Sequence, residues 1–188
     1  MGEVNSGTDR NMSNLTNTGN ISGSSKVGGV IGTLYQQSSS KGSEEYKSSK
    51  CDYHRYRFNT VVKNILNDGN VNGIDSVAGI IGYVYLDSSY STFVRSCCNY
   101  SGCDHYGDFR MVANNLSNNG EINGNTTLGE VFGHFVADTA SNVDNYTVTG
   151  KVIENGEVKE GNYDVGTNTN LTLSGREIYG EENTEATE

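Results

Sequence analysis

Apolar residues in this chain fall into short runs of Val, Ile, Leu and Phe, and polar stretches rich in Asn, Gly, Ser and Thr separate the runs. Short apolar runs bounded by Gly and Asn turns are typical of β-strands, because a helix needs a longer segment with a helical period. The abundant polar residues also favour turns over helix interiors. The pattern therefore predicts an all-β fold.

The runs recur within a block of nineteen residues that occurs three times without a gap. The copies begin at Asn14, Asn64 and Asn115, so successive copies start 50 and then 51 residues apart. They read NLTNTGNISGSSKVGGVIG, NILNDGNVNGIDSVAGIIG and NLSNNGEINGNTTLGEVFG. A fixed long period indicates a repeat architecture, in which stacked units together cover a core that one unit cannot bury alone. The sequence predicts an array of three such units.

Glycines and apolar residues keep their places in every copy of the block. Glycine at a fixed offset marks either a positive φ angle or a close approach of backbone where a Cβ atom would clash. The shared glycine positions are those of Gly19, Gly69 and Gly120, of Gly23, Gly73 and Gly124, and of Gly32, Gly82 and Gly133. The shared apolar positions include those of Ile21, Val71 and Ile122, of Val27, Val77 and Leu128, and of Val30, Ile80 and Val131. We expect the apolar positions to form a continuous core column.

Two asparagine positions are also shared. They are those of Asn14, Asn64 and Asn115, and of Asn17, Asn67 and Asn118. Stacked units would place identical amides at the strand spacing of about 4.8 Å, where they can hydrogen-bond along the stack. Asn also tolerates the left-handed backbone region that corners require. These residues are therefore predicted to be structural ladders and not ligand contacts.

The block ends in a motif, Val27-Gly28-Gly29-Val30-Ile31-Gly32 in the first copy, that resembles the GLUG-motif repeat. The second copy has Ala78 in place of the first Gly of the pair, and the third has Glu130 in place of the second. The departure at Glu130 suggests a terminal or fraying repeat. The resemblance implies a right-handed parallel β-solenoid (β-helix) in large bacterial surface or secreted proteins, adhesin-like proteins among them. It also implies that the repeats act as stalk or binding scaffold and carry no catalytic residues.

A kelch-like propeller is the rival fold, since its period is also about 50 residues. A closed ring needs at least four blades, more than the three units present. We therefore predict residues 1–13 to be an N-terminal segment or partial cap, residues 14–160 to be the three-unit solenoid and residues 161–188 to be a polar, acidic and partly disordered tail. A second, weaker similarity between the units is a segment that ends in Asx-Tyr, at Tyr53, Tyr100 and Tyr146. It predicts a second strand in each unit. Residues 38–49 and 101–109 are predicted to be loops.

The net charge of −10 argues against nucleic-acid binding, which requires clustered Lys and Arg. No segment approaches the roughly 20 apolar residues of a membrane-spanning helix, so no membrane insertion is expected. The N-terminus lacks the apolar core of a secretory signal. We interpret the chain as a piece of a longer protein located outside the cell or on its surface, with host or cell-surface glycans or proteins as possible partners.

No catalytic set, cofactor site or metal site is predicted. Cys98, Cys103 and His105 with Cys51 resemble a zinc site, but the second half-site, Cys51-x-x-His54, is an unusual ligand pair. A disulfide from Cys51 to Cys97 or Cys98 is a second reading, and free, half-buried thiols are the default. Asp104 and Asp108 could serve a polysaccharide-cleaving site, but nothing distinguishes them from ordinary loop acids.

Tyrosines supply the one candidate ligand face. Tyr35, Tyr83 and Tyr85, with Tyr90 and Tyr100, could line one side of the array. Exposed aromatic rows stack on sugar rings and anchor protein interfaces, whereas the alternative is that these rings only cover the core. We therefore predict a non-catalytic structural or adhesive segment, with a carbohydrate-binding or polysaccharide-active module on the same scaffold as the alternative.

Overall fold

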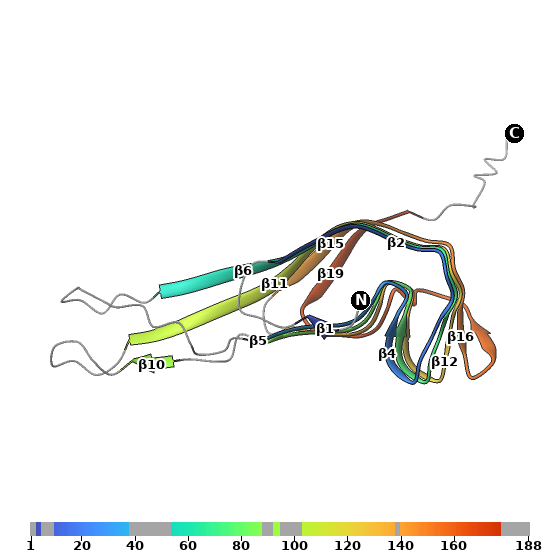
Figure 1. The fold of residues 1–188 in the computed structure, drawn as a ribbon, viewed down its shortest axis with the longest axis horizontal. Coiled ribbons are helices and arrows are strands. Elements are labelled where there is room, and N and C mark those ends of the chain that lie inside the picture. Colours follow the sequence, from blue (N-terminus) through green and yellow to red (C-terminus); the bar gives the residue numbers. More distant parts are fainter. Residues whose placement is uncertain are drawn as a thin grey trace, which may run out of the picture.

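The computed structural model describes residues 3–4, 10–37, 54–87, 92–94, 103–137 and 140–177. Every regular element in these ranges is a β-strand, which confirms the all-β prediction. The strands form four sheets in which most neighbours are parallel, and Figure 1 shows that successive units follow nearly the same path. Residues Cys51, Tyr90, Cys97, Cys98 and Tyr100, which carried sequence hypotheses, lie outside the described residues.

Each of the three blocks, together with the strand that leads into it, forms a unit of four strands. The first unit consists of β2 (Arg10–Asn17), β3 (Ile21–Ser22), β4 (Ser25–Gly28) and β5 (Ile31–Gln37). The second consists of β6 (His54–Asn67), β7 (Val71–Asn72), β8 (Asp75–Ala78) and β9 (Ile81–Asp87). The third consists of β11 (Cys103–Asn118), β12 (Ile122–Gly124), β13 (Thr126–Gly129) and β14 (Phe132–Ala137).

The remaining strands flank these three units. A fourth unit contains β15 (Ser141–Val148), β16 (Val152–Glu154), β17 (Glu157–Lys159) and β18 (Val165–Asn168), and β19 (Leu171–Glu177) follows it. Strand β1 (Glu3–Val4) pairs with β5, and β10 (Thr92–Val94) pairs antiparallel with β11. Strand β2 begins inside the segment 1–13 that was expected to be a cap, and paired strands continue past residue 160 to Glu177.

Each sheet takes the equivalent strand from successive units. The orders are β1-β5-β9-β14-β18, β19-β15-β11-β6-β2, β17-β16-β12-β7-β3 and β13-β8-β4. Ile31, Ile81 and Phe132 lie side by side in the first of these sheets, in the register that the gapless sequence alignment gives. Strands β6 and β11 pair with each other beyond the ends of β2 and β15, and Figure 1 shows them projecting together from the stack.

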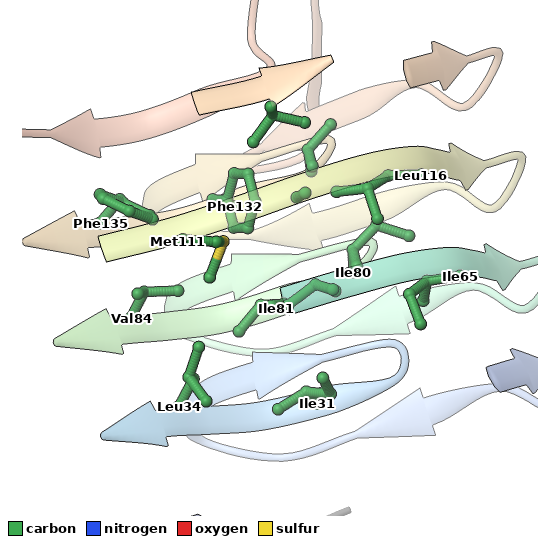
Figure 2. Close-up of a cluster of buried hydrophobic side chains, with 14 of the residues drawn as sticks. Ile31, Leu34, Ile65, Ile80, Ile81, Val84, Met111, Leu116, Phe132 and Phe135 are labelled. Carbon is green, nitrogen blue, oxygen red and sulfur yellow. The ribbon is translucent and has the colours of Figure 1, made fainter. Parts of the chain in front are cut away.

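The main core lies between the β5-β9-β14 sheet and the β2-β6-β11-β15 sheet. Figure 2 shows its side chains arranged from unit to unit, for example Leu34, Val84 and Phe135. A smaller core, formed by Val27, Val71, Val77, Ile122, Leu128 and Val152, fills the bend made by the short strands. Both cores are continuous across the units, as the repeat pattern predicted, because each unit covers its neighbour.

A fourth, diverged copy of the block begins at Asn145. Strand β15 pairs with β11 so that Tyr146 lies opposite Leu116, and Asn145 has the positive φ angle, 52°, that Asn115 has at 56°. The offset to the third copy is only 30 residues, as in the bond from Thr149 to Asn119. The interpretation of Tyr146 as an echo of Tyr53 and Tyr100 is therefore wrong, as is a terminal role for the third unit at Glu130. The backbone N–H of Glu130 donates to Tyr163 O of the fourth unit at 2.8 Å.

Asparagine ladders connect the units, as predicted. In the buried ladder, Asn17 Nδ2 donates to Asn67 Oδ1 and Asn67 Nδ2 donates to Asn118 Oδ1, both at 2.8 Å. The same Nδ2 atoms also donate to the glycine carbonyl two residues ahead, in Gly19, Gly69 and Gly120 respectively. Asn17 and Asn67 therefore each close their own turn and also bind the next unit, whereas Asn118 closes its turn and accepts from the unit before it.

A second ladder runs along the surface. Asn64 Nδ2 donates to Asn14 Oδ1 at 2.9 Å, and Asn115 Nδ2 donates to Asn64 Oδ1 at 3.0 Å. All three residues have left-handed backbone, with φ angles of 54° to 58°. The sequence prediction that Asn meets both needs, the corner and the ladder, is confirmed.

Positive φ angles also occur at a position without Asn or Gly, shared by Lys26, Ser76 and Thr127, with angles of 55°, 54° and 54°. A β-branched residue is strained there because its Cβ substituents crowd the backbone. We expect Thr127→Asn to raise the free energy of unfolding by about 1 kcal/mol in urea titrations. Lys26→Asn, at the same φ but without β-branching, should give a smaller gain. A loss of stability in Thr127→Asn would show that the Thr127 hydroxyl matters more than the strain.

Candidate functional site

The tyrosines predicted to form a ligand face do come together. Residues of β5, β9 and β14 alternate between the core and the outside, and the inward Leu34, Val84 and Phe135 are buried. The outward positions bring Tyr35 beside Tyr85 and Tyr83 beside His134 in the register of the sheet. We call Tyr35, Tyr83, Tyr85 and His134 the aromatic face. His134 holds the outward position that Thr33 and Tyr83 hold in the first two units.

The rings of the aromatic face contact one another both within the second unit and across units. The Tyr35 and Tyr85 rings stack with centroids 5.1 Å apart and planes 7° from parallel. The Tyr83 ring is parallel to Tyr85 at 6.5 Å and meets His134 edge-on at 5.2 Å. Lys26 Nζ, from the first unit, lies 4.3 Å from the centroid of Tyr83. Sequence reasoning missed Lys26, because only the register of the sheets brings residue 26 beside residue 83.

This geometry bears on what the face can bind. Stacking on a sugar ring requires an open aromatic face. Here neighbouring units occupy ring faces of Tyr83 and Tyr85, through Lys26 and Tyr35 respectively. The aromatic face is therefore better suited to joining the first three units from outside the sheet than to holding a sugar by stacking.

Two phenols of the aromatic face, those of Tyr83 and Tyr85, have raised pKa values. Burial raises the pKa of Tyr83, and the nearby Tyr35 adds to this effect. Burial also raises the pKa of Tyr85, and the Asp87 carboxylate, which accepts a hydrogen bond from Tyr85 Oη at 3.2 Å, raises it further. Both shifts favour the phenol over the phenolate in the folded state.

These shifts predict a loss of stability in alkali. Because the folded pKa lies above the unfolded value of about 10, the stabilisation is complete below pH 10 and is lost as the pH rises through the folded pKa. The melting temperature of the natural chain should therefore fall more steeply above pH 10 than that of the Tyr83→Phe, Tyr85→Phe variant. Tyrosinate absorbance should show the matching loss of late-ionising groups in the variant. Identical alkaline profiles for the two chains would contradict the shifts.

Two other polar clusters join segments, one between units and one within the fourth unit. Burial raises the pKa of Asp75, but hydrogen bonds from Thr126, Ser76 and Thr127 outweigh it and hold this pKa below its ordinary value. Thr126 Oγ1 of the third unit donates to Asp75 Oδ1 at 2.9 Å. In the fourth unit, Tyr146 Oη donates to Asp164 Oδ2 at 2.7 Å, with both residues buried. The first contact joins β13 to β8 of the neighbouring unit, and the second joins β15 to the segment just before β18.

The structure describes only some of the cysteine and histidine residues considered for a zinc site. The backbone register places His105 of β11 beside His54 of β6, and Cys103 beside Val94 of β10. Residues 103–109 belong to β11, so the loop predicted over 101–109 is wrong for that part. Asp104 and Asp108 are accordingly strand residues. In the part of the chain that the structure describes, no three His, Cys, Asp or Glu side chains are grouped to share a metal ion.

Comparisons with known proteins add no relative. No family model matches the chain, and no curated protein and no solved structure matches it significantly. Over the described ranges, the structure also contains no helix of the length and apolarity that a membrane crossing requires.

Proposed function

We propose that this chain is a non-catalytic structural or adhesive segment of a secreted or cell-surface bacterial protein, built as a right-handed parallel β-solenoid. The observation that carries the proposal is the buried ladder of Asn17, Asn67 and Asn118, which continues across unit boundaries in register. A ladder of this kind joins each unit to the next by side-chain as well as backbone hydrogen bonds. The resemblance of the block to GLUG-motif repeats supports the cell-surface setting.

Such an array suits a stalk or spacer. Parallel neighbours recur in all four sheets, and the two cores run through successive units without interruption. Stability in a stacked array is approximately a sum of unit and interface contributions, so length can be added without a new core. The described polar clusters hold strands together, as at Asp75 and Thr126, which is the role that a spacer requires of them.

Force spectroscopy tests the mechanical role. The chain is pulled between handles at its two ends, and units should unfold one at a time. One unit of about 50 residues should release roughly 170 Å of extended chain. Smooth extension at low force, without separate events, would count against a load-bearing segment.

Glycan binding is the second candidate function, favoured by the gathering of Tyr35, Tyr83 and Tyr85 on one outer face. A glycan-array screen of the folded chain tests it, with Tyr83→Ala, Tyr85→Ala as the matched variant. Specific binding that disappears in this variant would make the chain a carbohydrate-recognising adhesive segment. Absence of binding by a folded sample would leave the spacer role alone.

A further inference from the structure

The two ends of the stack differ. At the C-terminal end Val148 lies opposite Asn118, so the buried asparagine ladder stops. Strand β17 turns back antiparallel on β16, and Lys159 pairs with Glu154 at 3.3 Å. Strand β19 covers β15 in the same region. In the fourth unit Val143 is 0% and Val152 1% exposed, whereas Val165 of β18 and Leu171 and Leu173 of β19 are partly buried. Departures of this type are typical of a capping repeat.

The N-terminal end keeps the block unchanged but leaves it half-covered. Ile21, Leu15 and Val30 are partly exposed, whereas the residues at the same positions of the second unit, Val71, Ile65 and Ile80, are at most 1% exposed. Asn17 is likewise partly exposed, while Asn67 is fully buried. The first unit thus has the side chains of an internal unit without the cover that an internal unit receives.

At this end the two asparagine ladders have fixed and opposite donor-to-acceptor directions. In the buried ladder Asn17 donates through Nδ2 to the second unit. Its Oδ1 accepts from the Gly19 backbone N–H at 3.2 Å and lies on the side where another Nδ2 would continue the ladder. In the surface ladder the sense is reversed, because Asn14 accepts through Oδ1 from the second unit and retains Nδ2 as a donor. A further unit with the same block would supply the matching donor and the matching acceptor. A chain with any other sequence would have to reproduce both.

The space around Gly19 is an independent observation. A Cβ atom at Gly69 or Gly120 would lie 2.1 or 2.0 Å from the glycine carbonyl of the preceding unit. At Gly19 the nearest atom would be Asn17 Oδ1, at 3.8 Å, which is ordinary contact. The glycine position is thus retained at Gly19 where, among the described residues, no neighbour requires it. A preceding unit would supply the close carbonyl that makes glycine necessary.

Strand β1 already follows the geometry of such a unit. Glu3 and Val4 pair in parallel with Thr33 and Leu34, as these pair in turn with Tyr83 and Val84. Glu3-Val4 therefore takes the place in the sheet that the last strand of a preceding unit would take. In the sequence, Gly2 stands before Glu3 as Gly32 stands before Thr33.

We infer that the N-terminal end, formed by the edges of β2, β3 and β4, is a docking surface for one further repeat unit with the same block, whereas the C-terminal end is a cap. The unit adds parallel strands to these edges and continues both asparagine ladders. The inference rests on the proposed stacked array and gives it a direction: units are accepted at one end only.

An in-register graft tests the inference. Residues 60–81 are copied in front of Gly2, so that the copied Ile81 is followed by Gly2 as Ile81 is followed by Gly82 in the chain. Hydrogen exchange should show protected amides in the graft and slower exchange in β2 and β3. The same 22 residues in scrambled order at that end, or in natural order after Glu188, should remain unprotected. A graft that exchanges as fast as the scrambled one would overturn the inference.

The Gly19→Ala variant provides a second test, which depends on contact between the units and not on the composition of the graft. In the natural chain this substitution should leave the urea midpoint nearly unchanged. In the grafted chain it should lower the midpoint as Gly69→Ala does, because the graft supplies the glycine carbonyl that crowds the new Cβ atom. An equal midpoint shift in both chains would contradict docking. Failure here leaves the unit-by-unit unfolding of the natural chain under force intact, so the two proposals fail separately.

Discussion

Replacing Gly69 by alanine is expected to destabilise the chain by about 3 kcal/mol, whereas the same change at Gly19 should cost less than about 0.5 kcal/mol. The two residues hold the same place in adjacent units, and neither has a positive φ angle. They differ in crowding, because a Cβ atom would lie 2.1 Å from Gly19 O at Gly69 and 3.8 Å from its nearest neighbour at Gly19. The backbone carbonyl cannot move away without separating the first two units.

Urea unfolding of the two variants measures this difference, with Gly120→Ala as a repeat of the crowded case. At Gly120 a Cβ atom would lie 2.0 Å from Gly69 O, so its cost should match that of Gly69→Ala. Equal costs at all three positions would mean that lost turn flexibility, and not contact between units, explains the glycines. Small costs at all three would mean that the units separate easily.

Sequence reasoning reached the fold class and the ladders because both depend on residues that repeat in register. The sequence could not show why the block needs its turn glycine, because a positive φ angle and a close backbone approach both select glycine at a fixed position. The structure assigns close approach to Gly69 and Gly120, and positive φ to Asn14 and Lys26. Nothing in a lysine predicts left-handed backbone, so that position could not be found from residue type.

The fourth unit was not recognised as a copy of the block because two signals failed together. The offset shortens to 30 residues, and Val148 replaces the ladder asparagine. Asn145 and Gly150 do keep the five-residue spacing of Asn14 and Gly19, and a Cβ at Gly150 would lie 2.1 Å from Gly120 O. These two residues alone were too weak a match to identify a copy at a new offset.

The replacement of the ladder asparagine by Val148 also explains the presence of Glu130. A Cβ atom at Gly79 would lie 2.2 Å from Asn118 Cγ, so a unit needs glycine at this position when the next unit carries the ladder asparagine. The third unit is followed by Val148 at the ladder position and carries Glu130 where Gly79 stands in the second. The departure from the motif thus marks the end of the ladder and not the end of the array.

The sequence could predict which tyrosines form the candidate site, but not how their side chains are arranged. Alternation along β5 and β9 brings Tyr35, Tyr83 and Tyr85 to one face, which the spacing in the block could indicate. The contact of Lys26 with the Tyr83 ring depends on how far neighbouring strands are offset, and a single sequence does not specify that.

Asn67→Asp, an isosteric change in the buried ladder, should cost about 3–4 kcal/mol at neutral pH. Asn67 Nδ2 donates both to Asn118 Oδ1 at 2.8 Å and to Gly69 O at 2.7 Å. A carboxylate would replace these two donors by an acceptor in a fully buried place, facing two other acceptors. It would also introduce a charge where water cannot reach it.

Asn64→Asp is the matched control, three residues earlier in the same unit. Asn64 belongs to the exposed ladder and has a φ of 54°, a conformation that Asp also tolerates. Its loss should stay below about 1 kcal/mol, because water can solvate the new carboxylate and its neighbours.

The pH dependence of unfolding separates burial of charge from loss of hydrogen bonds. Burial raises the pKa of a carboxyl group, so the Asn67→Asp variant binds its proton more tightly when folded than when unfolded. Its deficit relative to the natural chain should therefore shrink as the pH falls from 7 toward 4, while that of Asn64→Asp should stay nearly constant. A deficit at Asn67 that does not change with pH would mean that the two lost donors account for all of it. The ladder would then hold the units together through hydrogen bonds alone, and its exclusion of water would contribute nothing measurable.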